Sequence, residues 1–379
     1  MMKGPFRADH VGSFLRPDSL LEKREEWKAD KISDSELRHF EDECISEIVR
    51  KEQQIGIKSV TDGEFRRESF HFDFINEIDA IKTNFNLKSA FAQGEKTKSG
   101  GDKAVPLTVE ITDRMELPEG GIGVENYKFL ASVAGAETTP KITMPSPTMT
   151  HFRGGREAIS REAYPELESF FADLAKLYRE EISMLADAGC KYIQFDDTNL
   201  AYLCDSNMRQ DARERGEDPD ELPRTYAALI NDCISERPSD MAACVHLCRG
   251  NARSLWFAEG DYEPIADHLF NLTDVDGFFL EYDDDRSGGF EPLRYVPKGS
   301  KKIVLGLVTT KRGSIESKDE IKKRIEEAAQ FVDISQLCLS PQCGFSSNAI
   351  GNIISEQEQF DKIGMIVELA NEIWGGLYV

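Results

Sequence analysis

The chain has 379 residues, of which 40% are hydrophobic and 30% are charged, as is typical of a globular protein. Its formal net charge of -23 would repel phosphate backbones and anionic lipid, so we expect no binding to nucleic acid or to a membrane surface. We find no signal peptide and no apolar run of membrane-spanning length. We therefore expect a cytoplasmic protein whose 8 cysteines are packing, metal-binding or catalytic residues and are not paired in disulfides.

Amphipathic helices alternate with short apolar runs along the chain. A capping box at 33–36 predicts the start of a helix that ends at Gly56. A later helix has apolar residues at helical spacing and ends at Gly189. A second capping box at 317–320 begins another helix, and the last helix runs through 363–374. This alternation is typical of βαβ units.

The apolar runs between these helices predict eight strands. Eight strands that alternate with helices imply a parallel arrangement, either an open doubly wound sheet or a closed barrel. The number of repeats favours an α/β chain that forms a single (β/α)8 TIM barrel over residues 1–379. The predicted strands are 8–13, 57–62, 141–145, 191–196, 242–248, 276–281, 302–308 and 335–340.

One stretch does not fit this pattern. Residues 83–130 include a polar, glycine-rich run at 93–103, and they fall between the helix of the second unit and the third strand. We interpret 83–130 as an inserted loop or hairpin after the second βα unit. A loop of this length inside a compact domain is usually functional or mobile. No sharper boundary along the chain indicates a second domain.

Three of the predicted strands end in residues that could bind a metal ion. His246 and Cys248 are two residues apart at the end of the fifth strand, so both side chains can reach one point. Glu281 ends the sixth strand, and Cys343 follows the eighth. In a barrel these ends meet at one mouth, and two thiolates, an imidazole and a carboxylate suit Zn²⁺. A carboxylate ligand can also give up its position to a substrate thiol, whose pKa zinc would lower.

A structural role is the alternative for each of these residues taken singly. Cysteine is among the most buried residue types, and a lone histidine at a strand end is usually a packing residue. The occurrence of all four at strand ends is what favours a shared metal ion. We expect packing roles for the other six cysteines: Cys44, Cys190, Cys204, Cys233, Cys244 and Cys338.

The other strand ends carry candidate substrate-binding residues. Gly12 would let the backbone near Ser13 approach an anionic group closely. Glu64 and Asp196 are carboxylates at the same mouth and could hold an ammonium group, although solvated loop positions or helix caps are the alternatives. His151 follows the third strand and could contact a substrate or only pack.

These motifs together resemble the cobalamin-independent methionine synthase family, specifically its zinc-bearing C-terminal barrel and the short single-barrel relatives. The resemblance covers nearly the whole chain and includes His-x-Cys, Glu and Cys in that order, with supporting matches at 9–13, 62–65, 144–148 and 194–197. It implies zinc as the cofactor, held by His246, Cys248, Glu281 and Cys343. It also implies that the amino-acid part of homocysteine is held by Gly12, Ser13, Glu64 and Asp196.

The reaction that the resemblance implies is methyl transfer to the sulfur of homocysteine to form methionine. The family's usual donor is 5-methyltetrahydrofolate with a polyglutamate tail. The chain is too short for the second, N-terminal barrel of the long form. Where that form has a proton-transferring histidine, this sequence reads Thr309-Thr310-Lys311, and the zinc motif continues through 249–251 as in the short relatives.

Several functions remain open at the level of sequence. We prefer a zinc-dependent methyltransferase in which Glu64 and Asp196 act in catalysis and bind the amine. Alkyl transfer to another thiol, such as coenzyme M, would not need those carboxylates. A structural zinc in a non-enzymatic binding protein is a third reading. A decarboxylase related to that of uroporphyrinogen ranks last, because that fold lacks the metal set. We expect the methyl donor to be of the methyl-folate type.

Overall fold

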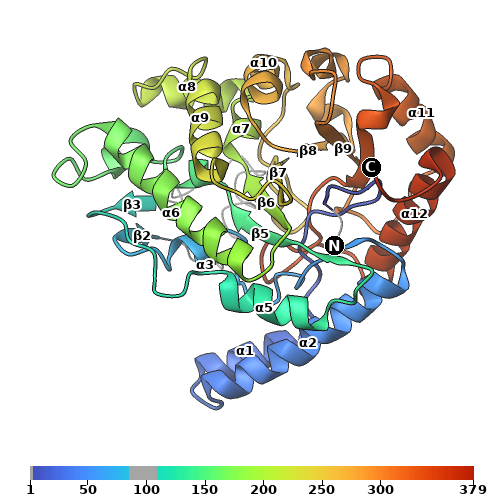
Figure 1. Cartoon of the computed structure of the whole chain (residues 1–379), viewed down its shortest axis with the longest axis horizontal. Helices are drawn as coiled ribbons and strands as arrows, with labels where there is room; N and C mark the ends of the chain where they lie inside the picture. The colour runs from blue at the N-terminus through green and yellow to red at the C-terminus, as the bar shows by residue number, and fades with distance from the viewer. Residues whose placement is uncertain (1–2, 85–108) are drawn as a thin grey trace.

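The computed structural model of the chain describes residues 3–84 and 109–379, and a parallel sheet lies at its centre (Figure 1). Six strands pair in parallel in the order β10-β9-β8-β7-β6-β5, so that strands consecutive in the chain are neighbours. A further parallel pair joins β1 to β4. The strand bounds are β1 Ser59–Val60, β4 Thr139–Pro140, β5 Ile142–Pro145, β6 Tyr192–Asp197, β7 Ala242–Leu247, β8 Gly277–Glu281, β9 Lys302–Val308 and β10 Leu337–Pro341.

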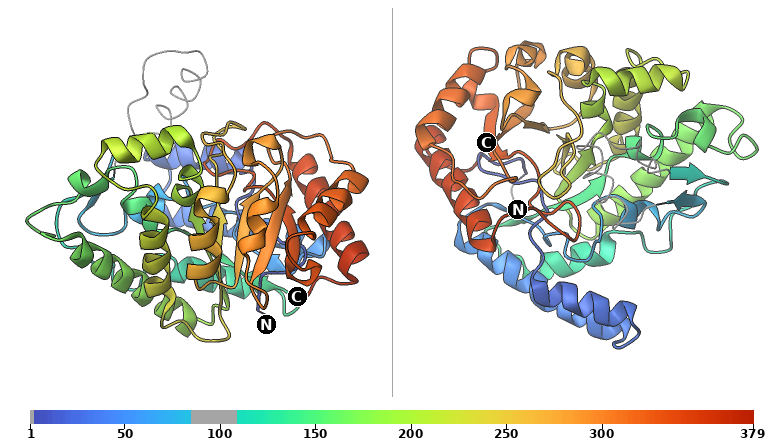
Figure 2. Two further views of the ribbon diagram at one scale, coloured as in Figure 1. Left: turned by 90° about the horizontal axis from the view of Figure 1, so that it is seen from above. Right: turned by 180° about the vertical axis from the view of Figure 1, so that it is seen from behind.

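The helices lie around the outside of these strands (Figure 2). The α-helices are α1 Asp18–Lys28, α2 Asp34–Gln54, α3 Phe72–Ile75, α5 Val124–Val133, α6 Leu167–Asp187, α7 Asn199–Tyr202, α8 Ser206–Glu214, α9 Leu222–Ile234, α10 Glu263–Leu272, α11 Lys318–Ala328 and α12 Glu356–Trp374. Short 3₁₀ turns are η1 Pro147–Thr150, η2 Gly155–Ala158, η3 Asp285–Ser287, η4 Glu291–Tyr295 and η5 Ile334–Gln336. The chain therefore has an α/β fold with a parallel sheet, as expected, although the strand pairings do not by themselves close a barrel.

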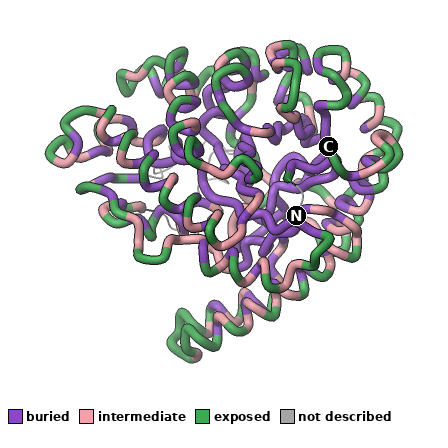
Figure 3. The backbone as a smooth tube through the Cα atoms, viewed as in Figure 1, coloured by how far each residue is buried: buried purple, intermediate pink, exposed green. Residues whose placement is uncertain are grey.

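The strands are buried on both faces, while the outer faces of the helices are exposed (Figure 3). Such burial is expected of parallel strands that helices cover. The predicted capping box of α2 is confirmed: the Ser33 side chain accepts from the Glu36 backbone, and the Glu36 side chain accepts in return. Gly56 and Gly189 follow their helices with φ angles of 83° and 97°, which favour glycine.

The first predicted strand, 8–13, is wrong in its extent. Only Ala8 forms a β-bridge, to Leu339 of β10, whereas every other predicted strand overlaps an observed one. The reason is that side chains bind backbone groups that a strand would use for hydrogen bonds to its neighbouring strands. The carbonyl oxygen of Val11, for example, accepts from Gln194 Nε2 at 2.6 Å.

The N-terminal segment nevertheless lies between β10 and β1. The Asp9 backbone N–H donates to the Leu339 carbonyl at 3.1 Å. On the other side, Ser59 Oγ of β1 donates to Asp9 Oδ1 at 2.7 Å. Further along, the Phe14 backbone N–H donates to the Gly63 carbonyl at 3.1 Å. This segment therefore contacts both β10, at one edge of the six-stranded sheet, and β1 of the separate β1–β4 pair, partly through side chains.

Half of the predicted insertion at 83–130 falls on 85–108, which lie outside the described residues. Its two described flanks form an antiparallel pair, β2 (Ile81–Thr83) with β3 (Val109–Ile111). Helix α5 begins at Val124, inside the predicted range. Among the helices of the described ranges, none is both long enough and apolar enough to span a membrane.

Candidate metal centre

Four side chains converge where strands β7, β8 and β10 end. His246 is in β7 and Cys248 follows it, Glu281 is the last residue of β8, and Cys343 lies two residues beyond β10. The ligand atoms of all four lie within 4.8 Å of one another, and all four residues are buried. We call His246, Cys248, Glu281 and Cys343 the ligand cluster. The convergence that the strand-end spacing predicted is present in the structure.

The sulfur and nitrogen atoms of the ligand cluster suit a metal ion. The sulfurs of Cys248 and Cys343 are 3.5 Å apart, much further than the S–S bond of a disulfide, and both cysteines are free. Neither ring nitrogen of His246 has a hydrogen-bond partner outside the ligand cluster, although both are buried. The hydrogen bond from Cys248 and the nearby His246 hold the pKa of the Cys343 thiol well below its usual range. Two sulfurs, a nitrogen and a carboxylate oxygen fit Zn²⁺.

Both oxygens of Glu281 have partners outside the ligand cluster. The Arg249 backbone N–H donates to Oε1 at 3.0 Å, and Arg286 Nη2 donates to Oε2 at 2.5 Å. Arg286 also pairs with Asp283 at 2.7 Å, and its side chain is 3% exposed. Burial raises the pKa of Glu281. Arg286 therefore holds this carboxylate in one orientation, as groups behind metal ligands commonly do.

Glu64 and Asp196 form a second acidic group, which we call the carboxylate pair. Glu64 Oε1 accepts from Thr143 Oγ1 at 2.9 Å and lies 3.8 Å from Arg67 Nη1, while Glu64 Oε2 is buried without a partner. Asp196 Oδ1 accepts from Gln194 Nε2 at 2.7 Å. Burial, followed by the charge of Glu64, raises the pKa of Asp196 to about 7. A bound ammonium would relieve this repulsion.

Gly12 and Ser13 lie beside these groups. Gly12 has a φ of 135°, and a Cβ there would come within 2.6 Å of Thr143 Cγ2. A Cβ on Gly344 would come within 1.9 Å of Ser13 Oγ, so Ser13 contacts the loop that carries Cys343. The close packing at both glycines fixes the backbone next to the ligand cluster and the carboxylate pair.

His151 has a different environment. Its Nδ1 is 2.9 Å from the hydroxyl of Tyr226 in α9, and its Nε2 is 3.4 Å from a carboxylate oxygen of Glu217. Its ring also contacts Phe171 of α6. Burial lowers the pKa of His151 to about 4. These contacts tie His151 to the surrounding helices, and its role as a substrate contact stays a prediction.

The sequence did not single out several residues that support the site. Arg286, Thr143 and Arg67 each contact a candidate site carboxylate. Arg67 follows Glu64 by three residues, which was a usable signal, because the polar segment after the second strand was already of interest. Thr143 lies inside a buried strand and offered no comparable signal.

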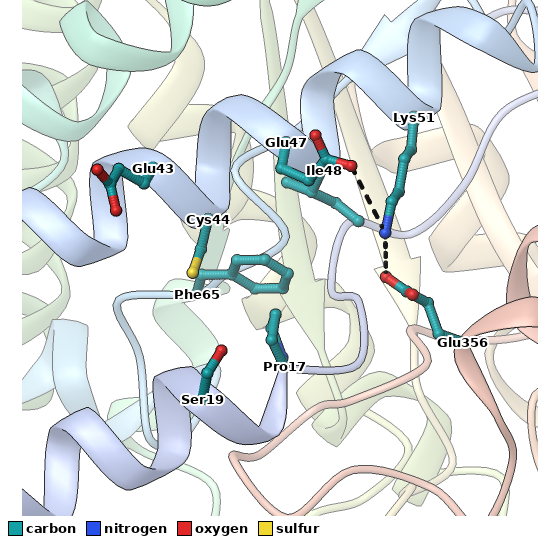
Figure 4. A pocket seen from close by; sticks show the side chains of 9 residues that line it. All are labelled: Pro17, Ser19, Glu43, Cys44, Glu47, Ile48, Lys51, Phe65 and Glu356. Atoms are coloured by element: carbon teal, nitrogen blue, oxygen red, sulfur yellow. Dashed lines mark hydrogen bonds and ion pairs between the residues drawn. The ribbon is translucent and has the colours of Figure 1, made fainter.

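A surface hollow of about 340 Å³ lies between α1 and α2, with Glu356 at its rim (Figure 4). Lys51 bridges it, with its Nζ 2.6 Å from Glu356 and 3.8 Å from Glu47. Burial, followed by nearby acidic residues, raises the pKa of the Cys44 thiol in its wall to about 11. The hollow is lined by none of the predicted site residues, and this thiol is not activated.

Comparisons with known proteins identify the family to which the chain is related. Residues 6–372 match the family described as "Cobalamin-independent synthase, Catalytic domain". The Bacillus subtilis protein called "Uncharacterized protein YxjG" is 42% identical over 373 residues, which cover 98% of this chain and 96% of that protein.

Two solved structures are similar along nearly their whole length. A putative vitamin-B12 independent methionine synthase from Listeria monocytogenes has a TM-score of 0.79 and 39% identity, and the match covers 99% of this chain and 100% of that one. A B12-independent methionine synthase from Shewanella sp. W3-18-1, in complex with selenomethionine, shares the fold with a TM-score of 0.70 and 18% identity, covering 97% and 98% of the two chains. The chain therefore belongs to the cobalamin-independent methionine synthase family, whose catalytic domain it matches along nearly its full length.

Proposed function

We propose that this protein is a zinc-dependent methyltransferase that moves a methyl group from a methyl-folate-type donor to the thiol of homocysteine. The observation that carries the proposal is the ligand cluster, with four ligand atoms within 4.8 Å of one another and both ring nitrogens of His246 without a partner outside the cluster. The 39% identity to a Listeria protein described as a putative methionine synthase supports the same reaction class.

The ligand cluster would hold the ion, and bound zinc would lower the pKa of a substrate thiol so that it is a nucleophilic thiolate near neutral pH. The chain's own residues then position the substrate. Glu64 and Asp196 hold its ammonium group, and the backbone at Gly12 with Ser13 holds its carboxylate. Arg286 keeps Glu281 oriented. Alignment matters because attack on a methyl carbon tolerates little misplacement.

A closed (β/α)8 barrel is part of the proposal. Segment 8–13 would take the place of the first strand, and its contacts with both β10 and β1 support this. Closure brings the ends of β1, β6, β7, β8 and β10 to one mouth, where the carboxylate pair and the ligand cluster face a common substrate.

The test combines metal content with transfer activity. We expect about one zinc per chain, and we expect Cys343→Ala to lose zinc and more than about 100-fold of activity, because changing even an outer partner commonly costs 10–100-fold. Cys44→Ala, a half-buried cysteine of α2, is the matched control and should keep both. Protein without zinc, or a fully active Cys343→Ala variant, would contradict the proposal.

Thiol and donor are identified separately. Zinc-loaded protein should release a proton on titration with homocysteine and not with coenzyme M, which lacks the ammonium group that the carboxylate pair would bind. Release with coenzyme M alone would favour alkyl transfer to another thiol, and release with neither would favour a structural zinc. The donor is found by assaying mono- and polyglutamyl methyl-folate, methylcobalamin and a methyl-sulfonium.

A further inference from the structure

Methyl transfer from nitrogen to sulfur moves a proton as well as a methyl group. The thiol loses its proton, the S–C bond forms, and the N–C bond breaks with its electron pair left on nitrogen. The leaving nitrogen then takes up a proton, so the overall reaction is balanced. A side chain that can take up a proton and pass it on is therefore needed close to the substrate, and histidine is the usual one. This inference rests on the proposed function.

The chain has six histidines. Four of them have at least one buried ring nitrogen without a hydrogen-bond partner: His10, His71, His151 and His246. His246 belongs to the ligand cluster, and His10 is buried between the Ser59 carbonyl and Glu52. His151 is held by Tyr226 and Glu217. The surface helices carry His39 and His268. His71 is the remaining buried histidine, and among the described residues it has no carboxylate at ion-pair distance, whereas His10 lies beside Glu52 and His151 beside Glu217.

His71 is buried and keeps one nitrogen without a partner. Its Nδ1 lies 3.2 Å from Ser69 Oγ, while its Nε2 is buried and has no hydrogen-bond partner. The rings of Phe70 and Phe72 lie against the imidazole, with centroids 4.3 Å and 3.9 Å away. Ser69 therefore fixes the orientation of the ring, and Nε2 is left to exchange a proton.

The segment that carries His71 is fastened to the loop that carries Cys343. Ser69 forms a β-bridge with Asn348, and the Phe70 backbone N–H donates to the Ser347 carbonyl at 3.0 Å. Ser347 Oγ is in turn 3.7 Å from Cys343 Sγ. These contacts place the segment next to the ligand cluster.

The same segment is fastened to the carboxylate pair. Arg67 Nη1 donates to the Phe70 carbonyl at 3.5 Å and lies 3.8 Å from Glu64 Oε1. The residues just before His71 therefore contact both the proposed amine-binding group and the loop of a proposed zinc ligand. A substrate held by both groups would lie beside this segment.

We propose that His71 is the proton-transfer residue of the reaction, passing a proton through Nε2 to the nitrogen that loses its methyl group. The proton that the thiol releases balances the one that the nitrogen gains, so no further reagent is needed. Burial, with the charge of Arg153, holds the pKa of His71 well below its usual range. The His71 ring is therefore neutral at rest, and once it is protonated it gives up that proton readily.

The test compares His71→Gln with the wild type on two donors. With methyl-folate we expect kcat to fall by about 10²–10⁴-fold, the usual contribution of a positioned acid. With a methyl-sulfonium donor we expect no change, because the leaving group is a neutral thioether that needs no proton. Zinc content and proton release on homocysteine binding should also match the wild type. His39→Gln, on the exposed face of α2, is the matched control.

Equal activity of His71→Gln and the wild type with methyl-folate overturns this inference alone. Equal losses with both donors indicate a structural role and overturn it as well. Tyr202 of α7 is a competing candidate, because the charge of Arg153 acts on it as it does on His71. A loss confined to the methyl-folate donor in Tyr202→Phe, and absent from His71→Gln, would therefore also overturn the inference. Wild-type transfer only from the sulfonium overturns the methyl-folate donor of the proposed function and this inference with it. A wild type that transfers from no donor overturns the proposed function and this inference together.

Discussion

Two groups of buried polar side chains differ in how completely they are partnered. In the interior, Asp9 and Lys141 are both 0% exposed, and Lys141 Nζ lies 3.0 Å from Asp9 Oδ1. Lys141 also donates to the His10 carbonyl and to Gln194 Oε1, while Asp9 Oδ2 accepts from the Tyr192 hydroxyl at 2.9 Å. In the ligand cluster, by contrast, neither ring nitrogen of His246 has a partner outside the cluster.

The difference teaches that burial and residue type alone do not identify a site. A buried polar network whose members are all satisfied stabilises one arrangement of the core, whereas a buried donor without a partner calls for a ligand. Gln194 connects the two groups, because it accepts from Lys141 and donates to Asp196. The lysine therefore determines which end of the Gln194 amide faces the carboxylate pair.

The largest expected effect comes from breaking the interior pair. Lys141→Met leaves Asp9 buried without its counter-charge, and we expect the free energy of unfolding to fall by about 3–5 kcal/mol. Urea unfolding followed by circular dichroism measures this loss. The double variant Asp9→Asn with Lys141→Met is the matched control, and it should recover most of the stability. If both variants lose the same amount, the interior pair is not the stabilising unit described here.

How much the sequence predicts depends on the range of the contacts. The convergence of the ligand cluster was predictable, since His246 and Cys248 share a strand face and parallel strands end at a common edge. The zinc itself stays a proposal. Arg286 could not be assigned, because an arginine within the acidic run 283–285 offers no sign that it folds back onto Glu281. The failed strand at 8–13 has the same origin: Gln194, far along the chain, binds its backbone.

The second-largest expected effect is on zinc affinity, and it tests how far the ligand cluster depends on its outside partners. Arg286→Gln removes the charged partner of Glu281 and should weaken zinc binding by about 10–100-fold, the usual effect of losing a group behind a ligand. Competition with a chromophoric chelator gives the affinity. Arg294→Gln, which breaks an exposed pair with Glu263, is the control and should leave zinc affinity unchanged. An unaltered affinity in Arg286→Gln would show that Glu281 needs no support.

A third, smaller effect is expected at the carboxylate pair. Thr143→Val keeps the shape of the side chain but removes the donor to Glu64, which can then turn toward Arg67. Loss of a hydrogen bond to a charged group should raise the KM for homocysteine by about 10-fold, with a smaller change in kcat. Zinc content, which does not depend on the carboxylate pair, should not change. A parallel loss of zinc would assign Thr143 a purely structural role.

The smallest effect is a pH dependence of the interior pair. Burial opposes ionisation of Asp9, but the charges of Lys141 and His10 lower the pKa of the carboxyl below its usual 3.8. Because the folded pKa is the lower one, Asp9 stabilises the fold above pH 3.8, and this stabilisation is lost as the pH falls through the folded pKa. The difference in unfolding free energy between the wild type and Asp9→Asn should therefore be constant near neutral pH and shrink in acid. A difference that grows in acid would mean that burial outweighs the charge of Lys141 in setting the pKa of Asp9. The buried charge of Asp9 would then be incompletely compensated, and the interior network would resemble the ligand cluster in this respect.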